Sequence, residues 1–447
     1  MSLWPFGKSK KRTFVLGIDG VPCSMLEQFL SAGRMPKLQA VLGGQSLTRM
    51  NSCYPTVSNV AWSCFQTGRN PGGFGVFGFA ELSRDMEMRF PNASDLRSET
   101  IWQILSRADK RVISLGVPLT YPPKPVNGLL AGCFLAPALE KAVYPDSFLP
   151  RLRSWGYKLD VDPMKARESL DNLKPDLLAC LAGRERAIME LWDSERWDLF
   201  VTHVMETDRI NHFMWRFLEE PESENGRFFL DFYRRVDDLI GKIAARLDER
   251  TEFMVLSDHG FCRTQKEVQL NRWLEEQGFL AYQDGGAQRG FAALCGKSRA
   301  FALVPGRIHI LSGEQWDGGQ VMPEQVAPLR EQIIARLKEW TDPENGKPIC
   351  ETILRREEAF TGPHAERAPD ILVHPHDGYD LKAALGSGEM FTHSPISGMH
   401  TYHDATLFLR GREIKGAKPW IGDVMPTLLT LCGVEPPAGL DGRSLVE

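Results

Sequence analysis

Three patterns that identify common protein classes are missing from this sequence. The nine cysteines, spread from Cys23 to Cys432, form no CxxC pair, so neither a thiolate zinc site nor a disulfide framework is indicated. This usage is typical of a reducing compartment, and we expect a cytoplasmic location. No apolar run approaches the roughly 20 residues that span a bilayer, so we expect no transmembrane segment. With a net charge of −5 and no long basic block, nucleic acid is not an expected partner.

The beginning of the chain also lacks the pattern of a secretory signal. In MSLWPFGKSKKR the apolar stretch is too short, and the basic residues follow it instead of preceding it. We therefore expect residues 1–12 to form a flexible, basic leader. A contact with a membrane surface through Trp4, Phe6 and the basic residues after them is the alternative.

What the sequence does contain is an alternation of short apolar and amphipathic segments. A buried strand is expected at 11–18, β–α alternation recurs at 111–117, 191–205 and 252–260, and a late strand is expected at 405–411. This order predicts an α/β fold whose mostly parallel central sheet is covered by helices on both faces. Helices are expected at 24–32, directly after Ser58, at 324–341 and at 423–432.

The stretch from about residue 290 to residue 382 differs in character. It combines the strand-like GRIHIL and PDILVHP with one helix and the turn-rich DPENGKPI. We expect residues 291–382 to form an inserted, smaller α+β cap subdomain. Residues 13–290 and 383–447 would then build the main domain.

Acidic and imidazole side chains follow the predicted strands. Asp19 comes directly after the first strand, Asp208 follows the segment 191–205, and Asp258 and His259 follow the strand that begins at 252. In a parallel sheet, ligands bind at the carboxyl ends of the strands, so we expect these side chains to converge. Oxygen and imidazole ligands without cysteine suit Zn²⁺, Mn²⁺ and similar divalent ions.

Two further histidines could complete such a metal site. His212 lies four residues after Asp208, so on a helix both side chains would reach one ion. His400 lies in SGMHTYHD, where His403, three residues later, is the alternative ligand. Taken singly, each of these residues could equally be a turn or cap residue. The other histidines are expected on the surface or in packing: His203, His309, His364, His374, His376 and His393.

Taken together, the motifs resemble a known family. GIDG, PTVSNVAWSCFQTGRNP, TDRINH, SDHG and GMH follow one another in the order seen in the alkaline phosphatase superfamily. Within it, the sequence resembles the type I phosphodiesterase/nucleotide pyrophosphatase family from about residue 13 to the C-terminus. The closing IGDVMPTLLTLCGVEPPAGLDGRSL is similar to the usual end of that family.

The resemblance implies an alkaline-phosphatase-like fold with two divalent metal ions, of which Zn²⁺ is the expected one and Mn²⁺ or Mg²⁺ the alternatives. It implies the nucleophile at Ser58, which lies three residues after Pro55 and ten before Gly68. The implied ligands are Asp19, Asp258, His259 and Ser58 for one ion, and Asp208, His212 and His400 for the other.

The function implied is metal-dependent hydrolysis of a small-molecule phosphoester, of the phosphodiesterase or nucleotide pyrophosphatase kind, through a phosphoseryl intermediate on Ser58. The N–H of Asn59, or the side chain of Asn59 or Arg209, would contact the phosphoryl group. A phosphomonoesterase, phosphoryl transfer of the phosphoglycerate mutase kind, and a non-catalytic binder of phosphorylated ligands are the alternatives. A sulfatase is not indicated, because SNVAW lacks the Pro and Arg of the C/S-x-P-x-R segment.

The sequence departs from the family pattern at two positions. Ala61 stands where nucleotide pyrophosphatases commonly have Asn, and Phe74 stands where the family pattern has His. These departures do not affect the predicted metal ligands, but the substrate and the preference for a diester or a monoester stay open. The sequence does not indicate the oligomeric state. Five aromatic side chains could stack on a base or sugar, or else belong to the core: Phe74, Phe77, Phe79, Tyr121 and Trp215.

Overall fold

The computed structural model describes residues 11–283, 290–294, 296–386, 388–393, 396–416 and 418–446. The leader predicted for residues 1–12 therefore lies outside the described residues except for its end. There, Arg12 is already the first residue of strand β1, Arg12–Ile18.

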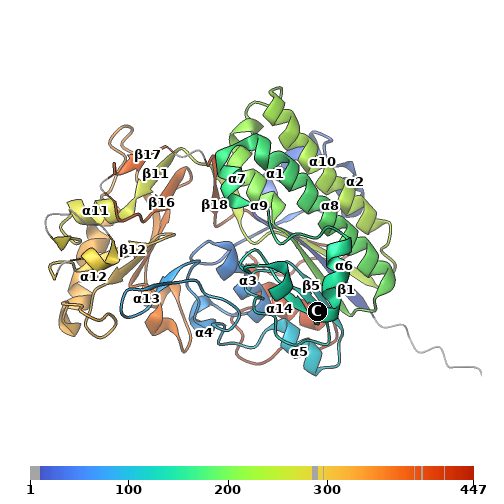
Figure 1. Ribbon diagram of the computed structural model, residues 1–447, viewed down its shortest axis with the longest axis horizontal. Helices are drawn as coiled ribbons and strands as arrows, with labels where there is room; N and C mark the ends of the chain where they lie inside the picture. The colour runs from blue at the N-terminus through green and yellow to red at the C-terminus, as the bar shows by residue number, and fades with distance from the viewer. Residues whose placement is uncertain are drawn as a thin grey trace, which may run out of the picture.

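The centre of the fold is an eight-stranded sheet in the described part of the chain, with the order β2-β19-β9-β1-β8-β5-β6-β7 (Figure 1). Neighbouring strands from β9 to β6 run parallel, whereas β19 and β7 are antiparallel to the strands beside them. The predicted mostly parallel sheet is thus confirmed. The bounds are β2 Thr48–Met50, β5 Val112–Leu115, β6 Gly128–Ala131, β7 Val143–Tyr144, β8 Leu199–Val204, β9 Thr251–Leu256 and β19 Ala405–Leu409.

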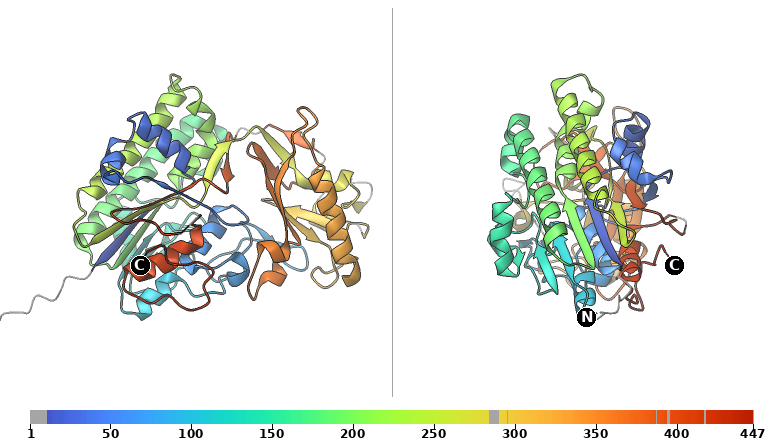
Figure 2. Two further views of the ribbon diagram at one scale, coloured as in Figure 1. Left: turned by 180° about the vertical axis from the view of Figure 1, so that it is seen from behind. Right: turned by 90° about the vertical axis from the view of Figure 1, so that its right-hand side faces the viewer.

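Strand β1 lies in the middle of this sheet, where both faces are covered, and every residue from Thr13 to Ile18 is buried there. Phe14 and Leu16 belong to the hydrophobic core under α1, α2, α8 and α10, whereas Val15 belongs to the core under α3, α5 and α14. Figure 2 shows these two helix layers on opposite faces of the sheet. The bounds are α1 Cys23–Ser31, α2 Pro36–Leu42, α3 Ser58–Thr67, α5 Ile101–Arg107, α8 Leu170–Ser194, α10 Glu224–Ala244 and α14 Val424–Leu431.

A smaller cap subdomain stands beside the main domain and has its own hydrophobic core (Figure 1). It contains a three-stranded sheet, β16-β11-β17, and a four-stranded sheet, β12-β13-β15-β14. Its core includes Val268 and is lined by Phe391, and both residues lie beyond the predicted limits of 291 and 382. The bounds are β11 Lys266–Gln269, β12 Ala300–Leu303, β13 Arg307–Ile310, β14 Cys350–Arg355, β15 Ile371–Pro375, β16 Tyr379–Lys382, β17 Phe391–Thr392, α11 Leu270–Glu276, α12 Pro323–Lys338 and α13 Arg356–Ala359.

The helices expected from the sequence are present with small shifts at their ends. The helix predicted for 24–32 is α1, the one predicted for 324–341 is α12, and the one predicted for 423–432 is α14. Helix α12 ends three residues early, before Trp340 turns into the core of the cap. Within the described ranges, no helix is both long and apolar enough to cross a bilayer.

Candidate active site

The predicted ligands converge at the carboxyl edge of the central sheet. Asp19 follows β1, while Asp258 and His259 follow β9. Asp208 and His212 lie on helix α9, Glu206–Met214, which begins just after β8. His400 comes from strand β18, Gly398–Thr401, which pairs with the short strand β10, Gly260–Arg263, directly after His259.

The first cluster consists of Asp19, Asp258 and His259, all fully buried. The Nε2 atom of His259 lies 3.5 Å from Asp19 Oδ1 and 3.4 Å from Asp258 Oδ2. The hydroxyl of Ser58 faces the same space, because its Oγ lies 3.3 Å from Asp19 Oδ1 and 3.2 Å from His259 Nε2. The structure therefore brings all four residues of the first predicted ligand set together.

The second cluster consists of Asp208, His212 and His400. The Nε2 atoms of both histidines lie 3.3 Å from Asp208 Oδ1 and 3.0 Å from one another. The i, i+4 spacing on α9 thus works as the sequence predicts. The two clusters adjoin, since the rings of His259 and His400 stack with their centroids 3.6 Å apart.

The three histidines of the two clusters share one hydrogen-bond pattern. The Nδ1 atom of each ring faces a backbone carbonyl: Gly260 O at 3.0 Å for His259, Gly398 O at 2.9 Å for His212, and Thr56 O at 3.2 Å for His400. A ring that donates from Nδ1 keeps a lone pair on Nε2, which is the arrangement of metal-binding histidines.

The donor sets of both clusters fit divalent cations. Asp258 Oδ2 and Asp208 Oδ1 are buried and have no hydrogen-bond partner among the described residues. Burial and the neighbouring Asp19 raise the pKa of Asp258 well above its ordinary value, as expected of a carboxylate that faces another without a cation. Burial, then the charge of His400, lowers the pKa of His259 to about 3, so this ring is neutral and able to bind a metal at pH 7.

The other two carboxylates respond to positive neighbours. Burial alone would raise the pKa of Asp208, but His212 and His400 outweigh it and hold the pKa well below the ordinary value. For Asp19, burial is outweighed by the hydrogen bond and charge of His203, which keep its pKa below the ordinary value. Both carboxylates are therefore anionic at neutral pH.

Ser58 owes its position to the start of helix α3. Val57 is still extended, with φ −148° and ψ 139°, so Ser58 is the first helical residue. One turn later, Trp62 packs against β1, where a Cβ on Gly17 would lie 2.4 Å from its ring, and its Nε1 donates to Asp19 Oδ2 at 2.9 Å. The helix is thus fixed to the same aspartate that Ser58 faces.

His203 is the residue that the sequence analysis missed. It was expected on the surface or in packing, but its Nε2 lies 2.6 Å from Asp19 Oδ2 and its Nδ1 lies 2.8 Å from Gly116 O. The signal is the register of β1 and β8, which places His203 opposite Gly17, two residues before Asp19. Only the strand pairing shows that these positions adjoin.

Asn59 and Arg209 lie beside the two clusters. Asn59 is buried, its Nδ2 donates to Gly78 O at 2.7 Å, and its Oδ1 has no partner in the described part of the chain. Arg209 reaches Asp208 Oδ2 at 3.2 Å, but its guanidinium mainly contacts Asp160, with a shortest distance of 2.6 Å. Both residues are thus placed near the ligands, Arg209 with its donors already engaged.

The remaining positions singled out in the sequence lie apart from the clusters. His403 bonds Asn51 Oδ1 at 3.2 Å, so it is His400 that belongs to the second cluster. Ala61 and Phe74, the two departures from the family pattern, are both fully buried in the core under α3. Among the five aromatic residues, Phe79 lines a cavity beside the clusters.

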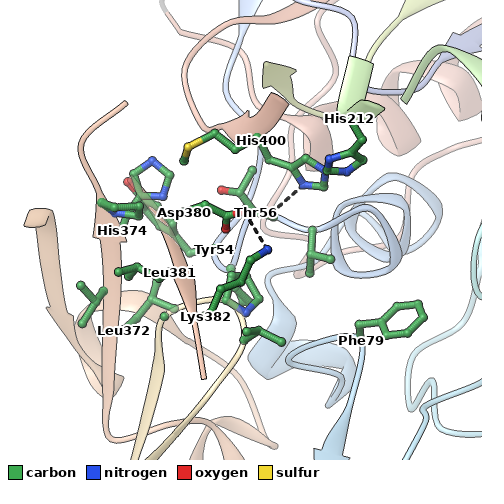
Figure 3. A pocket seen from close by; sticks show the side chains of 18 residues that line it. Tyr54, Thr56, Phe79, His212, Leu372, His374, Asp380, Leu381, Lys382 and His400 are labelled. Carbon is green, nitrogen blue, oxygen red and sulfur yellow. Dashed lines mark hydrogen bonds and ion pairs between the residues drawn. The ribbon is translucent and has the colours of Figure 1, made fainter. Parts of the chain in front are cut away.

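That cavity, here called the interface cavity, has a volume of about 290 Å³ and lies between the main domain and the cap. His212 and His400 of the second cluster line one side of it, and Figure 3 shows the side chains that line it. The opposite wall comes from β15 and β16 of the cap, including Leu372 and Leu381. There, Lys382 Nζ lies 2.7 Å from Asp380 Oδ2, so its charge is neutralised within the wall.

The helix-covered sheet has the fold of alkaline phosphatase PafA, and its two Asp/His clusters offer donors that could hold metal ions. The family model for type I phosphodiesterase / nucleotide pyrophosphatase matches residues 13–403, and the chain belongs to this family. It is accordingly an enzyme that hydrolyses phosphoester bonds.

Solved structures share the fold at low sequence identity. Phosphonoacetate hydrolase from Sinorhizobium meliloti 1021, in complex with phosphonoformate, is 17% identical with a TM-score of 0.63, over 95% of this chain and 96% of that chain. Alkaline phosphatase PafA is 13% identical with a TM-score of 0.61, over 98% and 99%. Murine ectonucleotide pyrophosphatase / phosphodiesterase 5, in complex with AMP, is 14% identical with a TM-score of 0.55, over 95% and 96%. No curated protein matches the sequence.

Proposed function

We propose that the protein hydrolyses a small-molecule phosphodiester or related phosphoester through a phosphoseryl intermediate on Ser58. The observation that supports this most directly is the position of Ser58 Oγ, which faces Asp19 and His259 of the first cluster at 3.3 and 3.2 Å. A hydroxyl is a poor nucleophile at neutral pH unless its surroundings favour the alkoxide. In the proposed site, a divalent ion held by the first cluster would favour the alkoxide of Ser58.

Asp19, Asp258, His259 and Ser58 would hold one divalent ion, and Asp208, His212 and His400 the other. The nitrogen and oxygen donors favour Zn²⁺, with Mn²⁺ or Mg²⁺ as alternatives. Such ions lower the pKa of a bound hydroxyl and neutralise charge on the oxygens of the phosphoryl group.

In the proposed reaction, Ser58 Oγ forms a bond to phosphorus while the bond to the leaving-group oxygen breaks, and the hydroxyl proton passes through solvent to that oxygen. Water then displaces Ser58 Oγ and releases the phosphorylated product. The backbone N–H of Asn59, near the start of α3, has no acceptor among the described residues and would donate to a phosphoryl oxygen. Arg209, held by Asp160, would act through its charge beside Asp208.

The interface cavity favours an uncharged, apolar leaving group. Its walls include Tyr54, Phe79 and Leu372, and Lys382 is the sole Lys or Arg among the described residues that line it. Because Asp380 already neutralises Lys382, a sugar acid or a second free phosphate would find no unpaired cation there. This supports a phosphodiesterase over phosphoryl transfer of the phosphoglycerate mutase kind.

The test compares hydrolysis of bis-p-nitrophenyl phosphate and p-nitrophenyl phosphate, with and without added Zn²⁺ or Mn²⁺. We expect metal-dependent turnover with a preference for the diester. Ser58→Ala should abolish turnover and retain bound metal. Acid quenching of the native enzyme during turnover should leave a phosphoryl group on Ser58, detected by mass spectrometry.

The matched control is Ser63→Ala, which removes a buried hydroxyl from the same helix. Ser63 Oγ donates to Asn59 O at 2.6 Å and lies outside both clusters, so this variant should keep its activity. An active Ser58→Ala variant would show that the nucleophile is assigned wrongly. A native protein that binds no metal and hydrolyses neither ester would overturn the proposal as a whole. A cytoplasmic location stays a prediction from the cysteine spacing.

A further inference from the structure

A second cavity, of about 620 Å³, lies where the cap meets the segment after α4, Pro71–Phe74. It is called the arginine cavity here. Its walls come from the hairpin β3–β4, Glu81–Leu82 and Met88–Arg89, and from the four-stranded sheet of the cap. Figure 1 shows α4 and α13 on this side of the junction. None of the seven predicted metal ligands lines it, so it is separate from the candidate active site.

The central feature of the arginine cavity is a buried cation without an anion. The side chain of Arg307 is 1% exposed, and its Nε and Nη2 donate to Val304 O at 3.0 and 2.6 Å, with a further bond from Nη2 to Ala80 O at 2.6 Å. Within the described residues, no carboxylate lies within ion-pair distance of it. Burial also lowers the pKa of Arg307 to about 10. A buried charge of this kind is costly unless an opposite charge joins it.

The nearest acidic side chain is already engaged. Glu81 accepts from Phe77 N at 2.9 Å through one carboxylate oxygen and pairs with Arg89 through the other. Arg89 also lies 2.9 Å from Asp95. The charge of Glu81 offsets part of the effect of burial on the pKa of Arg307, but both carboxylate oxygens of Glu81 are engaged by Phe77 N and Arg89, and none makes an ion pair with Arg307.

Further buried polar atoms without partners line the same cavity. The Nε2 atom of His309 and the Nε1 atom of Trp316 are buried and have no hydrogen-bond partner in the described part of the chain, and the same holds for Nε of Arg356. His309 and Trp316 are themselves 6% and 7% exposed, and their rings meet edge to face. Buried polar atoms are rarely left without partners, so their number in one cavity indicates a ligand.

The rim of the cavity carries both signs of charge. Arg84 pairs with Asp317 at 3.2 Å, whereas Arg367 is exposed and has no carboxylate partner among the described residues. Glu314 and Glu366 are also exposed at the rim. The interior, in contrast, carries Arg307, which has no ion-pair partner in the described part of the chain, and Arg356, which pairs with Asp370 at 2.6 Å.

We propose that the arginine cavity binds a small organic anion, with a phosphate or carboxylate group seated on Arg307 and contacted by His309 and Trp316. Because Nε and Nη2 of Arg307 already donate to backbone carbonyls, Nη1, which bonds no other described residue, would donate to the oxyanion. The volume of about 620 Å³ leaves room for a further organic part of the ligand. This site is independent of phosphoester hydrolysis at Ser58 and has its own residues.

The test measures binding of inorganic phosphate and of malonate to the full chain by thermal shift and calorimetry. Inorganic phosphate tests whether the cavity binds a phosphate group, and malonate tests whether it binds a carboxylate group. We expect at least one of them to raise Tm. Asp208→Asn, which disrupts the second cluster, should keep this shift. If the shift disappears in Asp208→Asn, the anion binds at the metal clusters and the proposal is wrong.

Arg307→Met should remove the shift. The variant also loses the hydrogen bonds to Val304 O and Ala80 O and should have a lower Tm in every buffer, so the anion-induced shift is the readout. A merely structural arginine predicts a lower Tm with the shift intact. Should Arg307→Met fail to fold, two milder variants decide. His309→Phe and Arg367→Ala should weaken anion binding roughly tenfold, whereas Arg336→Ala, an exposed arginine on α12, should not. Unchanged affinity in both variants would overturn the proposal.

Discussion

Replacing His203 with Phe tests how the first cluster is held in place. His203 is fully buried, and its two ring nitrogens face Asp19 Oδ2 at 2.6 Å and Gly116 O at 2.8 Å. Phe keeps a flat ring beside Trp62, whose ring meets that of His203 at 74° with the centroids 4.7 Å apart. The substitution removes both nitrogens, so Asp19 Oδ2 keeps only the bond from Trp62 Nε1 at 2.9 Å.

The expected loss follows from the hydrogen bond that disappears. A hydrogen bond to a charged group contributes about 1.5–3 kcal/mol. Since a tenfold change in affinity corresponds to about 1.4 kcal/mol, His203→Phe should weaken metal binding at the first cluster roughly 10- to 100-fold. The same range is typical for residues that orient a metal ligand. The second cluster, formed by Asp208, His212 and His400, does not contact His203 and should bind its ion unchanged.

The assay is a competition titration of Zn²⁺ against a chromophoric chelator, which resolves one weakened and one unchanged site. Urea unfolding reports separately whether the variant is folded. His203→Gln is the matched control, because an amide N–H can still donate to Asp19 and should recover part of the affinity. If His203→Phe binds two ions as tightly as the native chain, His203 does not position Asp19. Equal loss in both variants would likewise contradict the hydrogen-bond explanation.

Two further predictions concern charge in the folded state. Asp258→Asn should weaken metal binding, yet in EDTA the variant should be at least as stable as the native chain. The reason is that burial and the charge of Asp19 raise the pKa of the Asp258 carboxyl well above its ordinary value, so a charge there is unfavourable without a metal ion. A less stable variant in EDTA, measured by calorimetry, would contradict this. Burial, then the charges of His403 and His376, lowers the pKa of His374 to about 4. Between pH 6.5, the ordinary pKa of His374 in the unfolded chain, and about pH 4, the unfolded chain therefore binds more protons than the folded one, and the free energy of unfolding decreases as the pH is lowered. His374→Gln should therefore lose about 3 kcal/mol less than the native chain between pH 7 and pH 4 in urea unfolding, and equal losses would refute the assignment.

The sequence predicts the main domain well because its helices and strands have recognisable local patterns. FVLGI is short, apolar and bounded by glycines, and it forms the central strand β1. The convergence of the predicted ligands could be foreseen for the same reason, since Asp19 and Asp258 directly follow strands and the carboxyl ends of parallel strands share an edge. The spacing of Asp208 and His212 needed only a helix, which α9 supplies.

Features that depend on pairing between distant segments could not be predicted in this way. His203 lies two positions before Asp19 only in the register of β1 and β8, 184 residues apart in sequence. Arg307 is held in its buried position by hydrogen bonds to Val304 O and Ala80 O, and Ala80 belongs to a segment far away in the sequence. No local pattern distinguishes this arginine from one that is solvated.

The same division separates the chemistry of the site from its selectivity. The proposed nucleophile and the proposed metal ligands all come from the main domain, most of them at the ends of strands or the starts of helices, where backbone geometry fixes them. The interface cavity is closed on its other side by Leu372, Leu381 and the paired Lys382 of the cap. In the proposed reaction, the leaving group of a substrate must therefore fit a wall built by one subdomain while the phosphorus of the substrate reaches Ser58 in the other. Changes in β15 and β16 can alter which phosphoester is accepted without touching a single ligand, and for that reason motifs that identify the reaction leave the substrate open.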